Sequence, residues 1–225
     1  MTVKTSPLIV AIDGPSGAGK GTVARAVARA LGYRHVDTGA MYRAVAWLAL
    51  HAGLALDDEP RVAALATQAT FDLSDGGIRI DRHDVTTAIR TPNIDRAATM
   101  VARMPRVREA LVAEQRRMGQ QGGVVMEGRD IGTAVFPNAD VKVYLDASPE
   151  ERARRRANDP AHTGREAGTA RVASELAARD AIDRSRKASP LAVAADAVVV
   201  DTTEMSAEAV TARVLTLVEA VAARR

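Results

Sequence analysis

Residues 8–22 read LIVAIDGPSGAGKGT. The apolar run that ends at Asp13 has the β-branched composition and short length of a buried strand. The run VARAVARAL at 23–31 places apolar residues at helical spacing. The four glycines, one proline and one lysine between these two runs therefore lie at a turn from a strand into a helix.

Within this turn, Gly14, Gly19 and Lys20 match the pattern G-x-x-x-x-G-K of a phosphate-binding loop. Glycines allow successive backbone N–H groups to surround a phosphate chain, the lysine reaches the outer phosphates, and the following helix adds its positive dipole end. We therefore predict a site for ATP. Its residues are Gly14, Pro15, Ser16, Gly17, Ala18, Gly19, Lys20, Gly21 and Thr22.

The residue after Lys20 is Gly21, whereas many GTPases and motor ATPases have Ser or Thr there. The hydroxyl expected to bind Mg²⁺ or phosphate comes one place later, at Thr22. The string GKGT is similar to the loop of nucleoside monophosphate kinases. Thr22 is thus the candidate magnesium ligand, with water expected to supply most of the remaining ligands.

The composition favours one globular domain. The chain has 225 residues, of which 47% are hydrophobic, enough for one core and a small inserted subdomain. No apolar run approaches the roughly 20 residues of a membrane span, and the first residues lack a secretory segment, so we expect a cytoplasmic protein with no membrane partner. The absence of cysteine excludes disulfides and thiolate zinc sites.

The charge balance argues against a nucleic-acid partner. The chain has 31 basic and 28 acidic residues, and only 3% of its residues are aromatic, which leaves few rings for stacking on bases. All but four of the basic residues are arginine. Arginine suits bidentate phosphate contacts, but a GC-rich genome produces the same excess.

Strand and helix patterns alternate along most of the chain, which predicts an α/β fold with a parallel sheet covered on both faces. Ligands bind at the carboxyl ends of such strands. The ends to inspect are at 13–22, 37–39, 127–133, Asp146 and Asp201. A long helix is expected from about Arg171 to Lys187.

Two segments depart from the simple alternation. Residues 59–103 interrupt it with a helix at 59–69 and a hairpin about the turn at 74–77, which indicates a small antiparallel insertion. The polar stretch 158–169 is expected to be a mobile loop. The helix before that loop begins after Ser148, and we expect Glu151 to close a capping box with it.

Charged residues recur in two places beyond the first loop. Arg129 and Asp130 come together at a strand end, where a guanidinium and a carboxylate suit a phosphate and a polar base or sugar. On the long helix, Arg179, Asp183 and Arg186 share one face, and their spacing alone indicates a solvated helix surface. Asp180 and Arg184 form a second pair of the same kind.

The chain resembles the bacterial cytidylate kinases nearly from end to end. The motifs that carry the resemblance are IDGPSGAGKGT, DTGAMYR, IRT at 89–91, PRVREAL, EGRDIGT, VFPNADVKVYLDASPEERARRR and RDAIDRSRKASPL. The resemblance implies a P-loop kinase of one domain, residues 1–225, with a five-stranded parallel sheet flanked by helices. It also implies a monophosphate-binding insertion at about 38–103 and a short lid at about 152–170.

The resemblance also implies roles for individual residues. Cytosine is expected to contact Thr38, Arg108, Asp130 and Arg186. The ribose is expected to contact Thr99, Arg179 and Asp183, and the acceptor phosphate Arg43 and Arg129. Lys20, Arg43 and Arg129 are the expected catalytic residues, with Arg154, Arg155 and Arg156 as candidates from the lid. Two positions depart from the family pattern, which has Ser at position 38 and commonly Asp at position 127.

The implied activity is transfer of the γ-phosphoryl of MgATP to CMP or dCMP, giving ADP and CDP or dCDP in pyrimidine nucleotide metabolism. The resemblance suggests a monomer. Other acceptors, such as AMP, UMP or shikimate, are the nearest alternatives. A GTPase is disfavoured because the chain lacks N-K-x-D and D-x-x-G, and an RNA-binding module is disfavoured by the charge and aromatic content.

Overall fold

The computed structural model describes residues 7–74, 77–159, 168–186 and 188–224. Three expected features lie partly outside these ranges: the centre of the hairpin turn, most of the 158–169 loop, and Lys187 at the end of the long helix.

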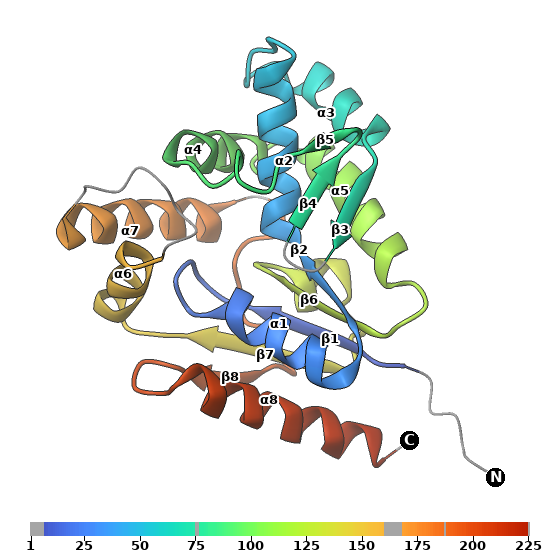
Figure 1. Ribbon diagram of the computed structural model, residues 1–225, viewed down its shortest axis with the longest axis vertical. Helices are drawn as coiled ribbons and strands as arrows, with labels where there is room; N and C mark the ends of the chain where they lie inside the picture. Colours follow the sequence, from blue (N-terminus) through green and yellow to red (C-terminus); the bar gives the residue numbers. More distant parts are fainter. Residues whose placement is uncertain (1–6, 75–76, 160–167, 187, 225) are drawn as a thin grey trace.

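A five-stranded parallel sheet with the strand order β2-β6-β1-β7-β8 forms the base of the molecule (Figure 1). Its strands are β1 (Ile9–Asp13), β2 (Arg34–Asp37), β6 (Val124–Gly128), β7 (Val141–Asp146) and β8 (Val198–Asp201). The polar strand ends are in register, because Asp13 pairs with Gly128, Asp37 with Glu127, and Asp146 with Asp201. The predicted α/β fold class is confirmed.

Helices cover both faces of this sheet, as the alternation of patterns predicts. Side chains alternate between the two faces of a strand, so Val10 and Ile12 of β1 pack in one apolar cluster and Ala11 packs in another. The first cluster also contains residues of α1 (Lys20–Leu31) and α8 (Ala207–Ala222), and the second contains residues of α2 (Thr38–His51) and α5 (Pro105–Gly119).

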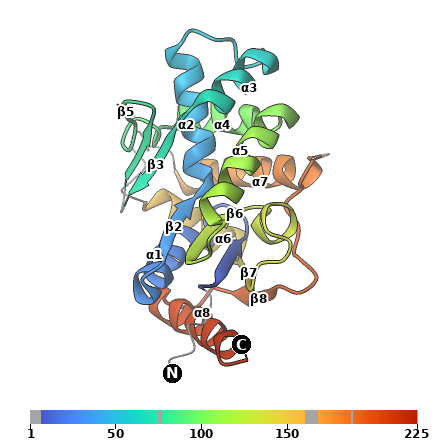
Figure 2. The ribbon, with the colours of Figure 1, turned by 90° about the vertical axis from the view of Figure 1, so that its right-hand side faces the viewer.

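A smaller unit rises from the sheet along α2 (Figures 1 and 2). It holds α3 (Glu59–Gln68), α4 (Pro92–Val101) and an antiparallel sheet of β3 (Phe71–Ser74), β4 (Gly77–Ile80) and β5 (His83–Asp84). The expected helix and hairpin are both present. The short strand β5 and the helix α4 were not expected, although the Thr91 N-cap and the helical spacing of Ile94, Ala97, Ala98 and Val101 were available signals for α4.

The remaining helices are α6 (Pro149–Ala157), α7 (Thr169–Ser185) and a π-helical turn, η1 (Ile131–Val135). Half of the expected capping box of α6 is present, because the Ser148 hydroxyl accepts the Glu151 N–H at 3.2 Å. The second hydrogen bond of the predicted capping box, from the Ser148 N–H to the Glu151 carboxylate, is absent. The Ser148 N–H donates to Thr203, and the Glu151 carboxylate instead accepts hydrogen bonds from Arg154 and Arg155.

None of the helices in the described part of the chain combines the length and apolar character required to cross a lipid bilayer.

Candidate active site

The predicted phosphate loop connects β1 to α1 at the carboxyl edge of the large sheet. Gly14 and Gly17 have φ angles of 146° and 84°, which side-chain-bearing residues rarely adopt. A Cβ at Gly14 would collide with the Leu145 carbonyl oxygen, and one at Gly17 would lie 2.8 Å from the Arg152 carbonyl oxygen. Close packing against β7 and α6 therefore explains why both positions are glycine.

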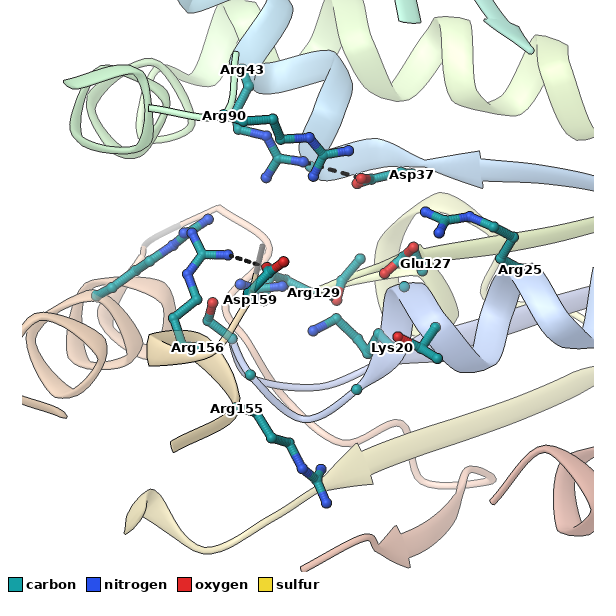
Figure 3. A pocket seen from close by; sticks show the side chains of 18 residues that line it. Lys20, Arg25, Asp37, Arg43, Arg90, Glu127, Arg129, Arg155, Arg156 and Asp159 are labelled. Atoms are coloured by element: carbon teal, nitrogen blue, oxygen red, sulfur yellow. Dashed lines mark hydrogen bonds and ion pairs between the residues drawn. The ribbon is translucent and has the colours of Figure 1, made fainter. Parts of the chain in front are cut away.

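A cavity of about 460 Å³ opens above this loop (Figure 3). Eight basic side chains line it against three carboxylates. The basic residues are Lys20, Arg25, Arg43, Arg90, Arg129, Arg155, Arg156 and Arg179, and the acidic residues are Asp37, Glu127 and Asp159. This surplus of positive charge, together with the N-terminus of α1, suits a ligand with several phosphates.

Lys20 begins α1 and is almost fully buried, with its ammonium donating to the Pro15 carbonyl oxygen at 2.7 Å. Burial, with a further contribution from Arg129, lowers the pKa of Lys20 from 10.5 to about 7. An anion that enters the cavity stabilises the charged form of Lys20, because a phosphate offsets both the lost hydration and the repulsion between cations.

Asp37 closes the second strand end and organises the start of α2. One of its oxygens accepts the Ala40 N–H as an N-cap, and the other lies 3.1 Å from Arg43. Burial alone would raise the pKa of Asp37, but Arg43, Arg90 and the Ala40 N–H outweigh burial and hold it at about 2. Asp37 is therefore a carboxylate that orients Arg43 toward the cavity.

Arg25, Arg90, Asp37 and Glu127 line the cavity and were not among the predicted site residues. Arg25 follows Gly21 by one helical turn, so its spacing along α1 was the available signal. Arg90 lies before α4 in the motif IRT at 89–91, which carried the family resemblance but was given no role.

The three candidate lid arginines separate into two groups. Arg155 and Arg156 line the cavity, and Arg156 also contacts Asp95 of α4 at 2.5 Å. The Arg154 side chain is 64% exposed and pairs with Glu151 on the outer surface of α6. Arg154 is therefore the weakest of the three candidates.

The charged face of α7 is buried, so the interpretation of this face as a solvated surface was wrong. Asp183 lies 2.9 Å from both Arg129 and Arg186. Asp180 is 2% exposed and pairs with Arg152 of α6 instead of Arg184. The sequence could not reveal this, because spacing shows which residues share a helix face but not what covers that face.

The electrostatics of Asp183 reflect its position between guanidinium groups. Burial alone would raise its pKa, but Arg129, Arg186 and Arg179 outweigh burial and hold the pKa below its usual value. The pKa of Arg179 is itself lowered, by burial and by the positive charge of Arg129. The carboxylate of Asp183 thus holds together cations that would otherwise repel one another.

The residues expected around cytosine lie next to this group, and two of them, Arg108 and Asp130, pair with each other. This ion pair is buried, and the Arg108 guanidinium lies over the Tyr42 ring at 5.7 Å. The Thr38 hydroxyl donates to the Glu127 carbonyl oxygen at 2.7 Å. A base in this position would therefore replace the contact between Arg108 and Asp130.

Asp13 supports this region from the end of β1. Its two oxygens accept the N–H groups of Ile131 and Gly132, each at 2.8 Å, and so fix the start of η1 directly after Asp130. Burial raises the pKa of Asp13 to about 6 despite these two hydrogen bonds.

Of the expected ribose contacts, Thr99 shares a cavity with Arg179 but not with Asp183. Its hydroxyl donates to the Asp95 carbonyl oxygen within α4, and its side chain lines a second cavity, of about 650 Å³, between α4 and α7. Arg179 lines both cavities, whereas Asp183 lines neither.

Within the described ranges, Arg43 Nε and Arg108 Nε are buried donors with neither a hydrogen-bond acceptor nor an ion-pair partner, whereas the buried Arg186 Nη2 lies 2.9 Å from Asp183 Oδ1. Buried guanidinium nitrogens are normally satisfied, so both positions call for an acceptor supplied by a ligand. One lies at the expected acceptor-phosphate position and the other at the expected base position.

The family model described as cytidylate kinase matches residues 10–220. The chain belongs to the cytidylate kinase family. It is 49% identical over 213 residues to "Cytidylate kinase" of Desulfitobacterium hafniense, covering 93% of this chain and 92% of that protein. It is 48% identical to "Cytidylate kinase" of Pelotomaculum thermopropionicum, covering 94% and 96% of the two chains.

A solved structure supports the fold of this cytidylate kinase family member. The shikimate kinase of Bacteroides thetaiotaomicron matches with a TM-score of 0.54 at 13% identity, covering 94% of this chain and 98% of that chain. The shared feature is the P-loop kinase architecture, and at this identity the match carries no information about the acceptor.

Proposed function

We propose that this chain transfers the γ-phosphoryl group of ATP to CMP or dCMP and produces ADP and CDP or dCDP. The observation that carries the proposal is one cavity in which Lys20 of the phosphate loop faces Arg43, Arg129 and Arg179. The donor phosphates on the loop and the acceptor phosphate on the arginines would meet in this cavity. Membership of the cytidylate kinase family supports the choice of acceptor.

The attacking oxygen of the acceptor phosphate is already anionic, so the transfer requires positioning and charge neutralisation more than a strong base. Lys20 and the backbone N–H groups of the loop, which Pro15 lacks, would hold the β- and γ-phosphates. Arg43 and Arg129 hold the acceptor phosphate, and Arg156 approaches from α6. Cations on several sides stabilise the charge on the transferring group in the transition state.

Cytosine recognition would use the contact between Arg108 and Asp130. Cytosine has a donor amine at N4 and acceptors at N3 and O2, so a carboxylate and a guanidinium are matching partners. Uracil would present a carbonyl oxygen to Asp130 and leave a buried polar group unpaired, at a cost of about 1–3 kcal/mol. Thr99, Arg179 and Asp183 would contact the ribose after α4 and α7 approach each other.

Magnesium fits the donor set of the cavity. The oxygen-bearing side chains there include Thr22, Asp37, Glu127 and Asp159, and within the described ranges no group of three or more His, Cys, Asp or Glu residues is arranged to hold a metal by itself. Mg²⁺ is typically held by one or two carboxylates together with phosphate oxygens and water. When bound, it would neutralise the charge between the β- and γ-phosphates.

The test is ADP release with MgATP and, in separate reactions, CMP, dCMP, UMP, AMP, shikimate and no acceptor. We expect turnover to be fastest with CMP and dCMP. Fastest turnover with another acceptor would overturn the base assignment and leave the phosphoryl transfer intact. Hydrolysis that is independent of any acceptor would overturn the kinase proposal.

The variant Asp130→Asn tests the base contact directly. An amide can satisfy either pyrimidine edge, so the preference for CMP over UMP should fall about tenfold, mostly through KM. Glu219→Gln, an exposed position on α8, serves as the control. An unchanged preference in Asp130→Asn would show that Asp130 does not read the base.

A further inference from the structure

His35 and Glu127 meet beside the phosphate loop. In the parallel pairing of β2 with β6, His35 lies opposite Val125, two residues before Glu127. Val125 belongs to the apolar cluster shared with α1, and side chains two residues apart point to the same face of a strand. Both His35 and Glu127 therefore face α1, at the edge where the loop enters the helix.

The contact between these two side chains is well defined. His35 Nε2 lies 2.9 Å from Glu127 Oε1, and both side chains are largely buried, with 15% and 8% of their surfaces exposed. A carboxylate only accepts hydrogen bonds, so the imidazole nitrogen is the donor. The second oxygen, Oε2, has no hydrogen bond or ion pair with any described residue, and Glu127 lines the phosphate cavity.

The other strand-end carboxylate in the cavity is already occupied. Both oxygens of Asp37 have partners, namely the Ala40 N–H and Arg43. Of the two strand-end carboxylates that line this cavity in the described structure, Glu127 is therefore the one with an oxygen left for a ligand. Figure 3 shows its side chain extending into the cavity between Lys20 and Arg25.

The glycine after the loop lysine fits the same arrangement. A Cβ at Gly21 would lie 3.3 Å from Glu127 Oε1 and 3.7 Å from Oε2, so the first of these contacts is tighter than an ordinary one. A larger side chain at position 21 would push the Glu127 carboxylate away and break its hydrogen bond with His35. The carboxylate thus lies beside the position at which many other phosphate loops carry the hydroxyl that binds magnesium.

We propose that His35 is a positioning residue, which fixes Glu127 Oε1 so that Oε2 faces the magnesium ion of bound MgATP or a water molecule in its shell. A glutamate has one more rotatable bond than an aspartate, and the hydrogen bond from His35 removes that freedom. Gly21 provides the space for the carboxylate. This inference rests on the proposed use of MgATP.

The test compares ATP binding with and without magnesium by isothermal titration calorimetry, with no acceptor present. In His35→Leu, the Kd for ATP with Mg²⁺ should rise about tenfold, as is typical when the partner of a metal-facing side chain is removed. The Kd for ATP in EDTA should not change. His35→Gln keeps an N–H donor and should recover most of the affinity for MgATP.

A double-mutant comparison links the effect to Glu127. An aspartate at position 127 is too short to keep the contact with His35, so His35→Leu should change MgATP affinity by less than about twofold in Glu127→Asp. The matched control is His51→Leu, which replaces an exposed histidine on α2 and should leave both affinities unchanged. Thermal unfolding of each variant monitors folding.

Equal weakening of ATP binding with and without magnesium in His35→Leu would overturn the proposal, because the histidine would then act on the loop and not on the metal-facing carboxylate. The same effect of His35→Leu in both Glu127 backgrounds would also overturn it. Failure of the kinase proposal would appear separately, as absent CMP turnover in the unmodified protein.

Discussion

Replacing Lys20 by methionine should abolish phosphoryl transfer and at the same time make the unliganded protein more stable. The pKa of Lys20 is about 7 in the fold, against 10.5 in the unfolded chain. At about 1.4 kcal/mol for each pH unit, keeping this lysine charged costs about 5 kcal/mol. Methionine removes that cost but loses the hydrogen bond to Pro15, so a net gain of about 2–4 kcal/mol is expected.

The pH dependence follows from the direction of this shift. Below about pH 7 the lysine is charged in both states, and the cost is fully present. Between pH 7 and 10.5 the unfolded chain binds more protons than the fold, so the stability of the unmodified protein rises with pH. The advantage of Lys20→Met in urea unfolding should therefore be largest near pH 6.5 and smallest near pH 10.

Binding of ATP should reverse the shift, because phosphate restores the charged form of Lys20. At pH 8 a group with a pKa of about 7 is about one-tenth protonated, so ATP binding should take up about 0.9 protons. Calorimetry in buffers of different ionisation enthalpy measures this uptake. It should fall to about 0.1 at pH 6 and be absent in Lys20→Met.

Lys142→Met is the matched control, because the Lys142 side chain is similarly buried, has Asp196 as a counter-ion and lies outside the cavity. Its loss should reduce stability or leave it unchanged, with phosphoryl transfer preserved. Two results would refute the argument that burial and neighbouring cations lower the pKa of Lys20. One is that Lys20→Met is no more stable than Lys142→Met at pH 6.5, and the other is that ATP binds at pH 8 without proton uptake.

Three further predictions concern the neighbouring charges. Asp183→Asn should raise the KM for CMP at least tenfold with little change for ATP, and should lower stability by about 3–5 kcal/mol, whereas Glu219→Gln at an exposed position of α8 should change neither. Nearby guanidinium groups outweigh burial and hold the pKa of Asp37 at about 2. The free energy of unfolding that Asp37 contributes above pH 3.8, about 2 kcal/mol, should therefore be lost as the pH falls toward 2. Urea unfolding of Asp37→Asn should not show this loss. Arg156→Ala should lower kcat and Arg154→Ala should not; equal losses in initial-rate measurements would contradict the different orientations of the two side chains.

The sequence predicts those parts of the fold in which a local pattern and a tertiary requirement coincide. The strand ending at Asp13, the loop and the helix from Lys20 are recognisable because strand composition, glycines and helical spacing occur in the required order. The segment with β5 and α4 was not predicted. β5 has only two residues, too few for a periodic pattern, whereas the helical spacing of Ile94, Ala97, Ala98 and Val101 in α4 was present but not recognised.

The site was predicted less completely, for a related reason. The spacing of Asp180 and Asp183 on α7 is compatible with a solvated surface, and only the tertiary fold places Arg152 and Arg129 against them. Glu151 illustrates the same limit on a smaller scale. Its sequence position suits a capping box, but nearby arginines provide a stronger electrostatic partner than a backbone N–H.

The carboxylates around the cavity have a common role that connects stability with function. Asp37 holds Arg43, Asp183 holds Arg129 and Arg186, and Asp130 holds Arg108. Each pair keeps a guanidinium buried and oriented without a ligand. Under the proposed function, a phosphate or a base would replace or supplement that contact. Lys20 has no such ion pair within the described structure, and its ammonium contacts a backbone carbonyl. Phosphate binding should therefore stabilise Lys20 more than any of these arginines. For this reason, Lys20→Met should raise the stability of the unliganded fold while it abolishes phosphoryl transfer.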